Sequence, residues 1–347
     1  MKTKLEYVLI AILSMVWGVL KAQTDVYETS IEQMLNHTMN KAFILGLPHP
    51  HSKGEIMVSY QFMGMGAGKI HNGFSEVSPA TVLNNYQVTP TKMNTYEHMF
   101  MGMYAPTDRL TLELSGKLVY NSMNMLMNST TLPSSSYTDK SSGLGDIRVL
   151  ATYLLLNKES NNVLINAGLS LPTGSVSLKD NSMGVLPYSM QIGTGTFDPG
   201  FSLTYLGATM KWSWGADIGS TLRLYNNNRG YRFGNSYQIS AGGAYQWLRW
   251  FSTSAKLQTF ITDKIKGYDN ALNPALSPVY NSQFSGGTNV NATIGAYFRV
   301  PDGFFKNNTF SIDYKENVYE NMKGVQLVPD RYIVLTWQWI FGIKTIK

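Results

Sequence analysis

The chain contains no cysteine among its 347 residues. Disulfide bonds, thiolate metal sites, cysteine nucleophiles and a lipid-modified N-terminal cysteine are therefore excluded. Charged residues make up 14% of the chain, whereas an ordinary soluble domain contains about 25%. Beyond the N-terminus, no apolar run approaches the roughly 20 residues of a membrane-spanning helix, which excludes a helical membrane bundle. The net charge of +6 comes without a cluster of lysine or arginine, so we expect no nucleic-acid partner.

The N-terminus has the features of a secretory signal. Lys2 and Lys4 precede an apolar stretch over 7–20, and Ala22 provides a small residue for cleavage. This stretch is too short to span a membrane as a helix, so residues 1–22 are predicted to be a signal peptide cleaved near Ala22. Apolar residues at helical spacing then predict a helix over 24–47. We expect residues 23–53 to form a helical and linker segment that either plugs a lumen or lies below it.

From Gly54 onward, apolar and polar residues alternate with the period of two that is typical of strands. In the third expected strand, Leu110, Leu112 and Leu114 lie on one face, whereas Thr111 and Glu113 lie on the other. Twelve strands are predicted in this way. They cover residues 54–66, 93–104, 109–125, 143–156, 163–172, 197–205, 212–225, 237–247, 251–262, 287–300, 309–317 and 331–342.

The connections between these strands alternate between long and short. Residues 67–92, 126–142, 173–196, 226–236, 263–286 and 318–330 form the long ones. Short periplasmic turns and long outer loops are typical of bacterial outer-membrane barrels. We therefore predict that residues 54–347 form an all-β, twelve-stranded antiparallel transmembrane β-barrel in the outer membrane, contacting outer-membrane lipid. A secreted β-sandwich, which alternates as well, is the other fold left open.

Several segments resemble a known family of outer-membrane barrels. They include residues 142–147 (SGLGDI), 166–175 (NAGLSLPTGS), 186–196 (LPYSMQIGTGT) and 212–216 (WSWGA), with weaker likeness at 53–60 and 101–108. This pattern is similar to the barrels catalogued as MetA-pathway-of-phenol-degradation proteins, often described as transporters. The resemblance implies an outer-membrane location and a role in passage of a solute. It implies no catalytic residue and no agreed substrate.

Ten of the 18 methionines lie between residues 57 and 127, and all ten have odd numbers. In the first three strands the odd positions share a face with polar residues, which is the expected lumen face. The predicted solute-contacting residues on this wall are Met57, Met63, Met65, Glu97, Met99, Met101, Met103, Glu113, Met123 and Met125.

Three roles for this methionine wall are open. Thioethers are soft ligands that suit Cu(I) and Ag(I), which would then be transported or bound ions rather than resident cofactors. The same side chains give a flexible, polarisable surface for apolar or aromatic molecules. Methionine also fills irregular space. A second soft-metal site is conceivable before the barrel, where the candidate ligands are Met34, His37, Met39, His49 and His51.

The sequence therefore predicts an outer-membrane channel that passes a small apolar or aromatic solute, or a soft metal ion, along a methionine-lined lumen. A non-conducting structural or metal-binding barrel is the alternative. An outer-membrane lipid hydrolase is a remote one, because His98 has no serine two positions away on its strand. We therefore expect no enzyme activity, and the sequence identifies no periplasmic partner.

Overall fold

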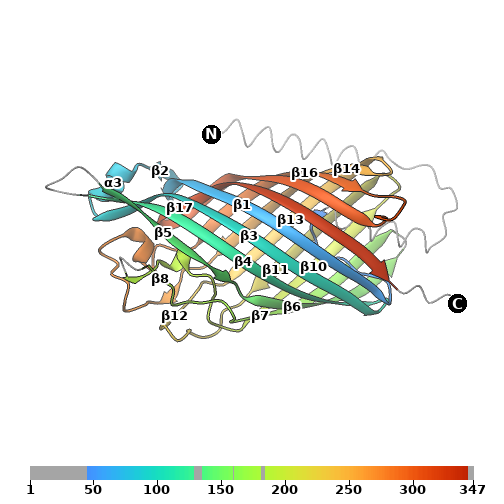
Figure 1. Ribbon diagram of the computed structural model, residues 1–347, viewed down its shortest axis with the longest axis horizontal. Helices are drawn as coiled ribbons and strands as arrows, with labels where there is room; N and C mark the ends of the chain where they lie inside the picture. Colours follow the sequence, from blue (N-terminus) through green and yellow to red (C-terminus); the bar gives the residue numbers. More distant parts are fainter. Residues whose placement is uncertain (1–44, 129–134, 159, 181–183, 343–347) are drawn as a thin grey trace.

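The computed structural model describes residues 45–128, 135–158, 160–180 and 184–342. Within them, a closed antiparallel sheet forms a tall barrel (Figure 1). The ring closes because the first and last strands pair along their length, from Glu55 opposite Gly342 to Gly73 opposite Met322. Closure leaves no unpaired strand edge, as a barrel in lipid requires.

The described residues place eleven strands in this ring. They are β1 (Glu55–Gly73), β3 (Val88–Thr107), β4 (Leu110–Met127), β6 (Ile147–Lys158), β7 (Asn161–Leu171), β10 (Asp198–Ala208), β11 (Trp212–Thr221), β13 (Ser236–Leu248), β14 (Phe251–Thr262), β16 (Gly287–Arg299) and β17 (Asn308–Gly342).

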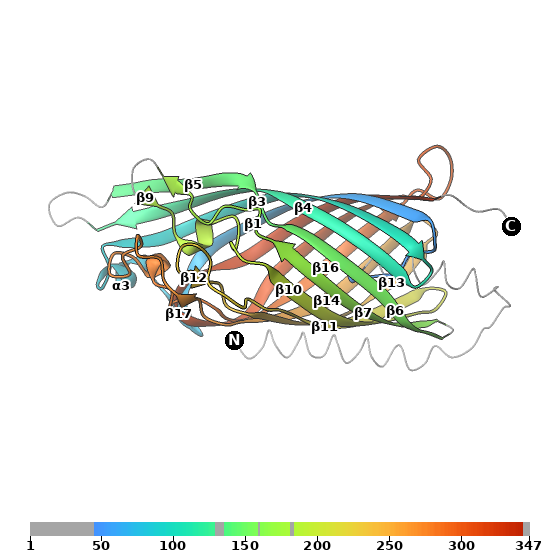
Figure 2. The ribbon, with the colours of Figure 1, turned by 90° about the horizontal axis from the view of Figure 1, so that it is seen from below.

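Two further strands of the same sheet lie outside the ring, namely β2 (Ser75–Val77) and β5 (Ser135–Leu144). The long connections also contain short elements. These are β8 (Lys179–Asp180), β9 (Gly184–Val185), β12 (Tyr231–Arg232), β15 (Lys266–Gly267), the helix α3 (Pro79–Leu83) and the 3₁₀ turns η2 (Tyr188–Met190) and η3 (Pro278–Tyr280). Most of these elements gather at one end of the barrel, on the left in Figures 1 and 2, and short turns join strands at the other end.

The ring has eleven strands where twelve were expected, because the last two expected strands belong to the single element β17. Its first part pairs with β16 and its second part with β1. A bond from Trp337 Nε1 to Asn308 Oδ1 of 2.7 Å joins the two parts. Between them lies Gly324, whose φ of +96° suits a turn that only glycine adopts easily. The two parts of β17 therefore lie side by side.

The long outer loops expected at 67–92 and 318–330 are mostly strand, so these two expectations are wrong. Ala67 to Asn72 pairs with 325–329, and Val88 continues β3 opposite Met127. The inward residues of these extensions, among them Ile70 and Val88, are buried. Because packing and pairing both continue there, the wall of the barrel extends beyond the expected span.

Alternation sorts the side chains between the two faces of the wall. Phe100 is 56% exposed and Leu114 is 58% exposed, whereas the inward Met103 and Thr111 are buried. An apolar outer surface on a closed sheet is what lipid contact requires, and polar residues alternate into the lumen. No helix in the described part of the chain is long and apolar enough to cross a membrane. The expected helix over 24–47 lies almost entirely outside the described residues.

Candidate functional site: a barrel lumen closed at both ends

The methionine wall faces inward, as the parity of its residues predicts. Met57 lies opposite Met103 on β1 and β3, and Met93 lies opposite Met123 on β3 and β4. All four side chains are buried. Met63, Met65, Met99 and Met101 lie on the same strands and are partly buried. The methionines therefore run along one side of the lumen.

At the end of the barrel with the long loops, this wall is covered by the connection between β7 and β10, residues 172–197, which we call the β7–β10 loop. Met123 and Met125 pack in one apolar cluster with Leu186 and Met190 of the loop. Ser141 Oγ also donates to the carbonyl of Met190 at 2.7 Å. Met123 and Met125 are 1% and 0% exposed, so in this conformation they fill space. Their contact with a solute stays a prediction.

A cavity of about 440 Å³ lies between the β7–β10 loop and the opposite strands. This volume is within the range of small-molecule sites in proteins. Its apolar lining includes Met93, Met123, Ile192, Phe233, Ile265 and Phe284. Arg223 and Asp263 contribute charge at its edge. We call this space the chamber.

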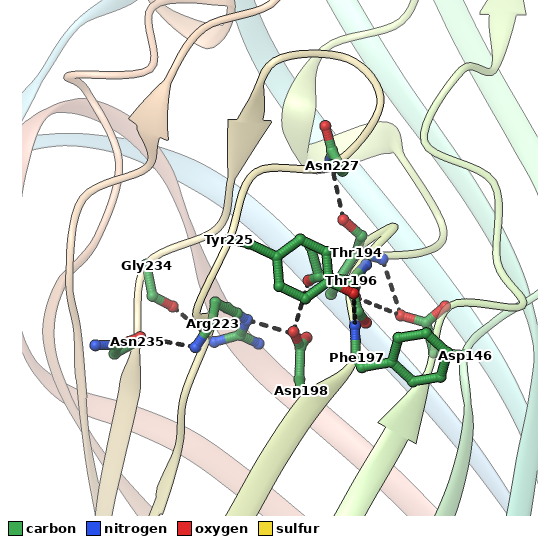
Figure 3. A network of polar contacts seen from close by, with 10 residues as sticks. All are labelled: Asp146, Thr194, Thr196, Phe197, Asp198, Arg223, Tyr225, Asn227, Gly234 and Asn235. Carbon is green, nitrogen blue, oxygen red and sulfur yellow. Dashed lines mark hydrogen bonds and ion pairs between the residues drawn. The ribbon is translucent and has the colours of Figure 1, made fainter.

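Asp146 anchors the β7–β10 loop to the wall (Figure 3). It lies between β5 and β6, and its carboxylate accepts bonds from the Gly174 N–H at 2.9 Å and from the Thr194 N–H and hydroxyl at 2.8 and 2.9 Å. Bonds to an ionised acceptor are stronger than bonds between neutral groups. Asp146 therefore holds both ends of the loop from a position just before β6.

Two glycines allow this loop to fold so closely. A Cβ on Gly193 would lie 2.2 Å from the Gly174 carbonyl oxygen, and one on Gly174 would lie 2.7 Å from Gly193 Cα. Neither position accepts a side chain without moving backbone. Gly174 and Gly193 belong to the PTGS and GTGT segments, and Asp146 ends the GLGD segment. The segments that carry the family resemblance thus meet in space.

Further bonds hold the β10 end of this loop, as Figure 3 shows. Thr196 Oγ1 donates to Asp198 Oδ1 at 2.6 Å, and Arg223 Nε lies 3.4 Å from Asp198 Oδ2. Arg223 Nη1 donates to the Gly234 carbonyl at 2.6 Å. Arg223 therefore links the start of β10 to the connection between β11 and β13.

The opposite end of the lumen, with the short turns, is filled by residues 45–54, which we call the plug segment. Leu45 and Leu47 are 2% and 6% exposed. They pack against inward residues of five strands, namely Leu154, Leu164, Leu206, Ala244 and Tyr297.

Polar contacts carry the plug segment across the lumen. Lys256 Nζ of β14 donates to the Leu45 carbonyl at 3.0 Å. On the other side, the His51 N–H donates to Thr111 Oγ1 at 3.0 Å and the Lys53 N–H to Asp108 Oδ1 at 2.8 Å. The segment is therefore tied to opposite walls of the barrel.

The comparisons with known proteins agree with this architecture. The family model described as "Putative MetA-pathway of phenol degradation" matches residues 84–314. The chain belongs to this family. The match confirms the resemblance carried by the GLGD and PTGS segments.

Similar solved structures are outer-membrane barrels. An outer-membrane channel from Pseudomonas putida F1 is 14% identical, with a TM-score of 0.57 over 86% of this chain and 98% of that one. A FadL homologue from Pseudomonas aeruginosa is 9% identical, with a TM-score of 0.42 over 82% of this chain and 90% of that one. At these identities the likeness concerns the fold, and the second score is too low to carry an argument. A search of curated proteins found no match.

Met34, His37 and Met39, three of the expected soft-metal ligands, lie outside the described residues. His49 and His51 lie in the plug segment with ring centroids 5.0 Å apart. His49 Nδ1 contacts the Leu47 carbonyl at 3.0 Å, and His51 Nδ1 lies 3.4 Å from Glu55 Oε2. The described residues contain no group of three His, Cys, Asp or Glu side chains suited to a metal ion. A metal site at these histidines stays a prediction.

Burial of His49 makes the seating of the plug segment sensitive to pH. Burial is the largest cause, followed by the neighbouring His51, and together they lower the pKa of His49 from 6.5 to about 4. Above pH 6.5 the imidazole is neutral whether the segment is seated or displaced, so seating is fully stable. As the pH falls below 6.5, the displaced segment binds a proton that the seated one does not, which disfavours seating by about 2 kcal/mol at pH 5.

We therefore expect acidification from pH 7.5 to 5 to expose the residues beneath the plug segment. A single cysteine placed at Ala244, in a chain with no other cysteine, reports this exposure through its labelling by a hydrophilic methanethiosulfonate. The label is applied at each pH, and a surface cysteine labelled in parallel corrects for the pH dependence of thiol reactivity. His49→Gln should remove most of the pH effect. An equal response with and without His49 contradicts the assignment.

The middle of the lumen is polar. Asp217 of β11 accepts bonds from Thr204 Oγ1 at 2.7 Å and from Gln238 Nε2 at 2.9 Å, and Asn166 Nδ2 donates to Thr204 Oγ1 at 2.9 Å. Four neighbouring strands, β7, β10, β11 and β13, contribute to this network. It lies between the apolar cluster of the plug segment and the chamber.

Glu97 and Glu113 both face inward, but they do not face each other. Glu97 pairs with Lys117 Nζ at 2.9 Å, whereas Glu113 accepts a bond from Ser115 Oγ at 3.2 Å. Glu97 lies opposite Val119 and Glu113 opposite Met103, several residues apart along the β3–β4 pair. The register therefore separates the two carboxylates along the lumen.

The contacts of His98 do not support the hydrolase alternative. Its Nδ1 bonds to the hydroxyl of Tyr60 at 2.8 Å, and its ring lies 5.2 Å from that of Phe62 on the outer surface. These contacts place His98 in an aromatic patch of the outer wall.

Sequence reasoning missed two other residues that matter more, Leu45 and Leu47, because an irregular segment has no periodicity to reveal which side chains are buried.

Proposed function

We propose that this protein passes a small apolar or aromatic solute across the bacterial outer membrane. The observation that carries the proposal is the chamber of about 440 Å³, which lies within a membrane-type barrel and presents more apolar than polar surface. Apolar pockets of this size with a few polar groups are typical of small-molecule sites. The charged edge at Arg223 would orient a solute with one polar group.

Two comparisons support the proposal. The family name refers to phenol degradation, and phenol is a small aromatic molecule with one polar group. The Pseudomonas putida structure is titled as an outer-membrane channel. The barrel fold and the family also support an outer-membrane location. In this proposal the end with short turns is periplasmic, and residues 1–22 are the signal peptide removed near Ala22.

The solute would travel from the chamber along the methionine wall towards the plug segment. On this path it would meet Met93 and Met123 first, then Met63, Met65, Met99 and Met101, and finally Met57 and Met103 near the periplasmic mouth. Both closures would have to open during passage. The β7–β10 loop closes the outer end, and the plug segment closes the inner one.

A charge in the chamber should block uptake. We expect Met93→Leu to leave the uptake of radiolabelled phenol or toluene close to that of the parent protein, because leucine keeps an apolar surface. Met93→Glu should reduce it at least about tenfold, since a solvated carboxylate must be dehydrated to admit an apolar solute. Cells that lack the endogenous barrel would be the assay host.

Met210→Glu is the matched control, because Met210 is 66% exposed at the end with short turns. It makes the same chemical change far from the chamber and should leave uptake unchanged. Similar surface levels of all variants are needed for the comparison. If Met93→Glu transports as well as Met210→Glu, the chamber is not on the solute path.

The soft-metal hypothesis is tested by a different substitution. Leucine at Met63, Met65, Met99 and Met101 removes the thioethers but keeps the apolar wall. Copper or silver sensitivity of the cells should then be unchanged if the solute is apolar. A marked change in sensitivity, at equal surface expression, would favour Cu(I) or Ag(I) as the solute.

A further inference from the structure

Two aspartates face each other where the β7–β10 loop meets the wall. Asp139 lies on β5, in the position opposite Met123 of β4. Asp180 ends β8, which belongs to the β7–β10 loop and contacts β5. Asp139 is 1% exposed, and both of its carboxylate oxygens are buried without a hydrogen-bond partner among the described residues.

The surroundings of Asp139 do not compensate its charge. The groups that face it are Asp180, Tyr137 of its own strand and Tyr280 of η3. The neighbouring Lys140 and Lys179 have exposed side chains. Burial, and then the nearby Asp180, raise the pKa of Asp139 to about 6. Among the described residues no base faces this carboxylate, so a negative charge there is left uncompensated.

We propose that Asp139 and Asp180 bind a divalent cation of the Ca²⁺ class that fastens the β7–β10 loop to β5. Two adjacent carboxylates without donors supply hard, negatively charged oxygen ligands, which Ca²⁺ prefers. The cation would remove the repulsion between the two carboxylates and occupy the unpartnered oxygens of Asp139. Backbone carbonyls and water complete such a coordination shell in many Ca²⁺ sites.

This cation would join β5 to the β8–β9 ribbon of the β7–β10 loop. The β8–β9 ribbon consists of Lys179–Asp180 and Gly184–Val185. Asp146 holds the loop near Gly174 and Thr194, on either side of this ribbon. The cation therefore fixes the β8–β9 ribbon, whereas Asp146 fixes the two ends of the loop. The inference does not depend on which solute the protein passes.

Tb³⁺ luminescence tests the site directly, using the full-length protein in detergent at pH 7.5. Tb³⁺ replaces Ca²⁺ and is excited through nearby tyrosines, and Tyr137 and Tyr280 lie beside the proposed site. We expect tyrosine-sensitised emission that saturates with one Tb³⁺ per protein and that Ca²⁺ displaces more effectively than Mg²⁺, because Mg²⁺ requires a more rigid, smaller site.

Asp139→Asn and Asp180→Asn should each weaken Tb³⁺ binding at least about tenfold, since each removes one charged ligand. Asp302→Asn is the control, because Asp302 lies in a short turn at the other end of the barrel and is exposed. Asp180 is partly exposed, so its variant is expected to fold even if the buried Asp139 variant does not. Heat-modifiable migration on gels checks that each barrel is folded.

Two outcomes would overturn the proposal. One is the absence of saturable emission from the parent protein. The other is emission that both aspartate variants retain at the level of Asp302→Asn. If the pair instead shares a proton, Asp139→Asn would raise the unfolding temperature at pH 7.5 and Ca²⁺ would leave that of the parent unchanged, which also rejects a cation site.

Discussion

Replacing both Leu45 and Leu47 with serine is expected to expose the lower lumen. In the parent protein these side chains are buried among inward residues of five strands. Burial of each leucine contributes about 2 kcal/mol, so the double substitution weakens seating by about 4 kcal/mol. The ratio of displaced to seated plug segments should therefore rise by about a thousandfold.

A cysteine at Ala244 measures this change, because Ala244 is 3% exposed in the same cluster. Its labelling by a hydrophilic maleimide should be at least about a hundredfold faster in the double variant, as opening becomes frequent. Lys53→Ser is the control, since Lys53 lies on the plug segment with an exposed side chain. Equal labelling rates in the two variants would show that the leucines do not hold the segment.

Asp146→Ala is expected to release the β7–β10 loop from the wall. The substitution removes an ionised acceptor that receives three bonds, from Gly174 and Thr194. Bonds to a charged group contribute about 1.5 kcal/mol or more each, so the three bonds together contribute about 4.5 kcal/mol or more to holding the loop. The amides of Gly174 and Thr194 would also be left without their acceptor. Opening of the loop should therefore be the main effect, because closure of the barrel depends on other contacts.

The buried Met190 offers a position for the reporter. It belongs to the loop, is 0% exposed and packs against Met123 and Met125 of the wall. A cysteine at this position should be labelled at least about a hundredfold faster when Asp146 is alanine. Asp330→Ala is the control, because Asp330 forms a surface ion pair with Arg331 at 3.5 Å, and such pairs contribute little. Unchanged labelling at Met190 would exclude Asp146 as the anchor.

The wall of the barrel could be predicted from the sequence because a strand between lipid and lumen has two different environments. Leu110, Leu112 and Leu114 alternate with polar residues and do lie in one strand, β4. The same alternation placed the methionines on the inner face. Alternation could not show where the membrane-spanning part of β3 ends and its extension at Val88 begins, because both parts have paired backbones and buried inward residues.

The closures at the two ends could not be predicted in this way. The plug segment and the β7–β10 loop have irregular backbones, so side-chain periodicity does not indicate what they bury. Asp146 was visible in the GLGD segment, but its partners Gly174 and Thr194 become neighbours only when the loop folds back. Asp139 looked like an ordinary polar residue of an outer loop. Its partner Asp180 is 41 positions away, a distance that no local pattern bridges.

The pairing of β1 with β17 has a consequence for how the molecule forms. Glu55 meets Gly342, and Gln338 donates a bond to the Met57 sulfur, so the seam joins residues almost three hundred positions apart. Until β17 pairs with β1, the edge of β1 has unpaired amides and carbonyls that lipid cannot satisfy. Contacts of such high sequence separation form late and slowly. An assembly intermediate would therefore be an open, curled sheet, and its exposed first strand is where an insertion factor would need to shield it.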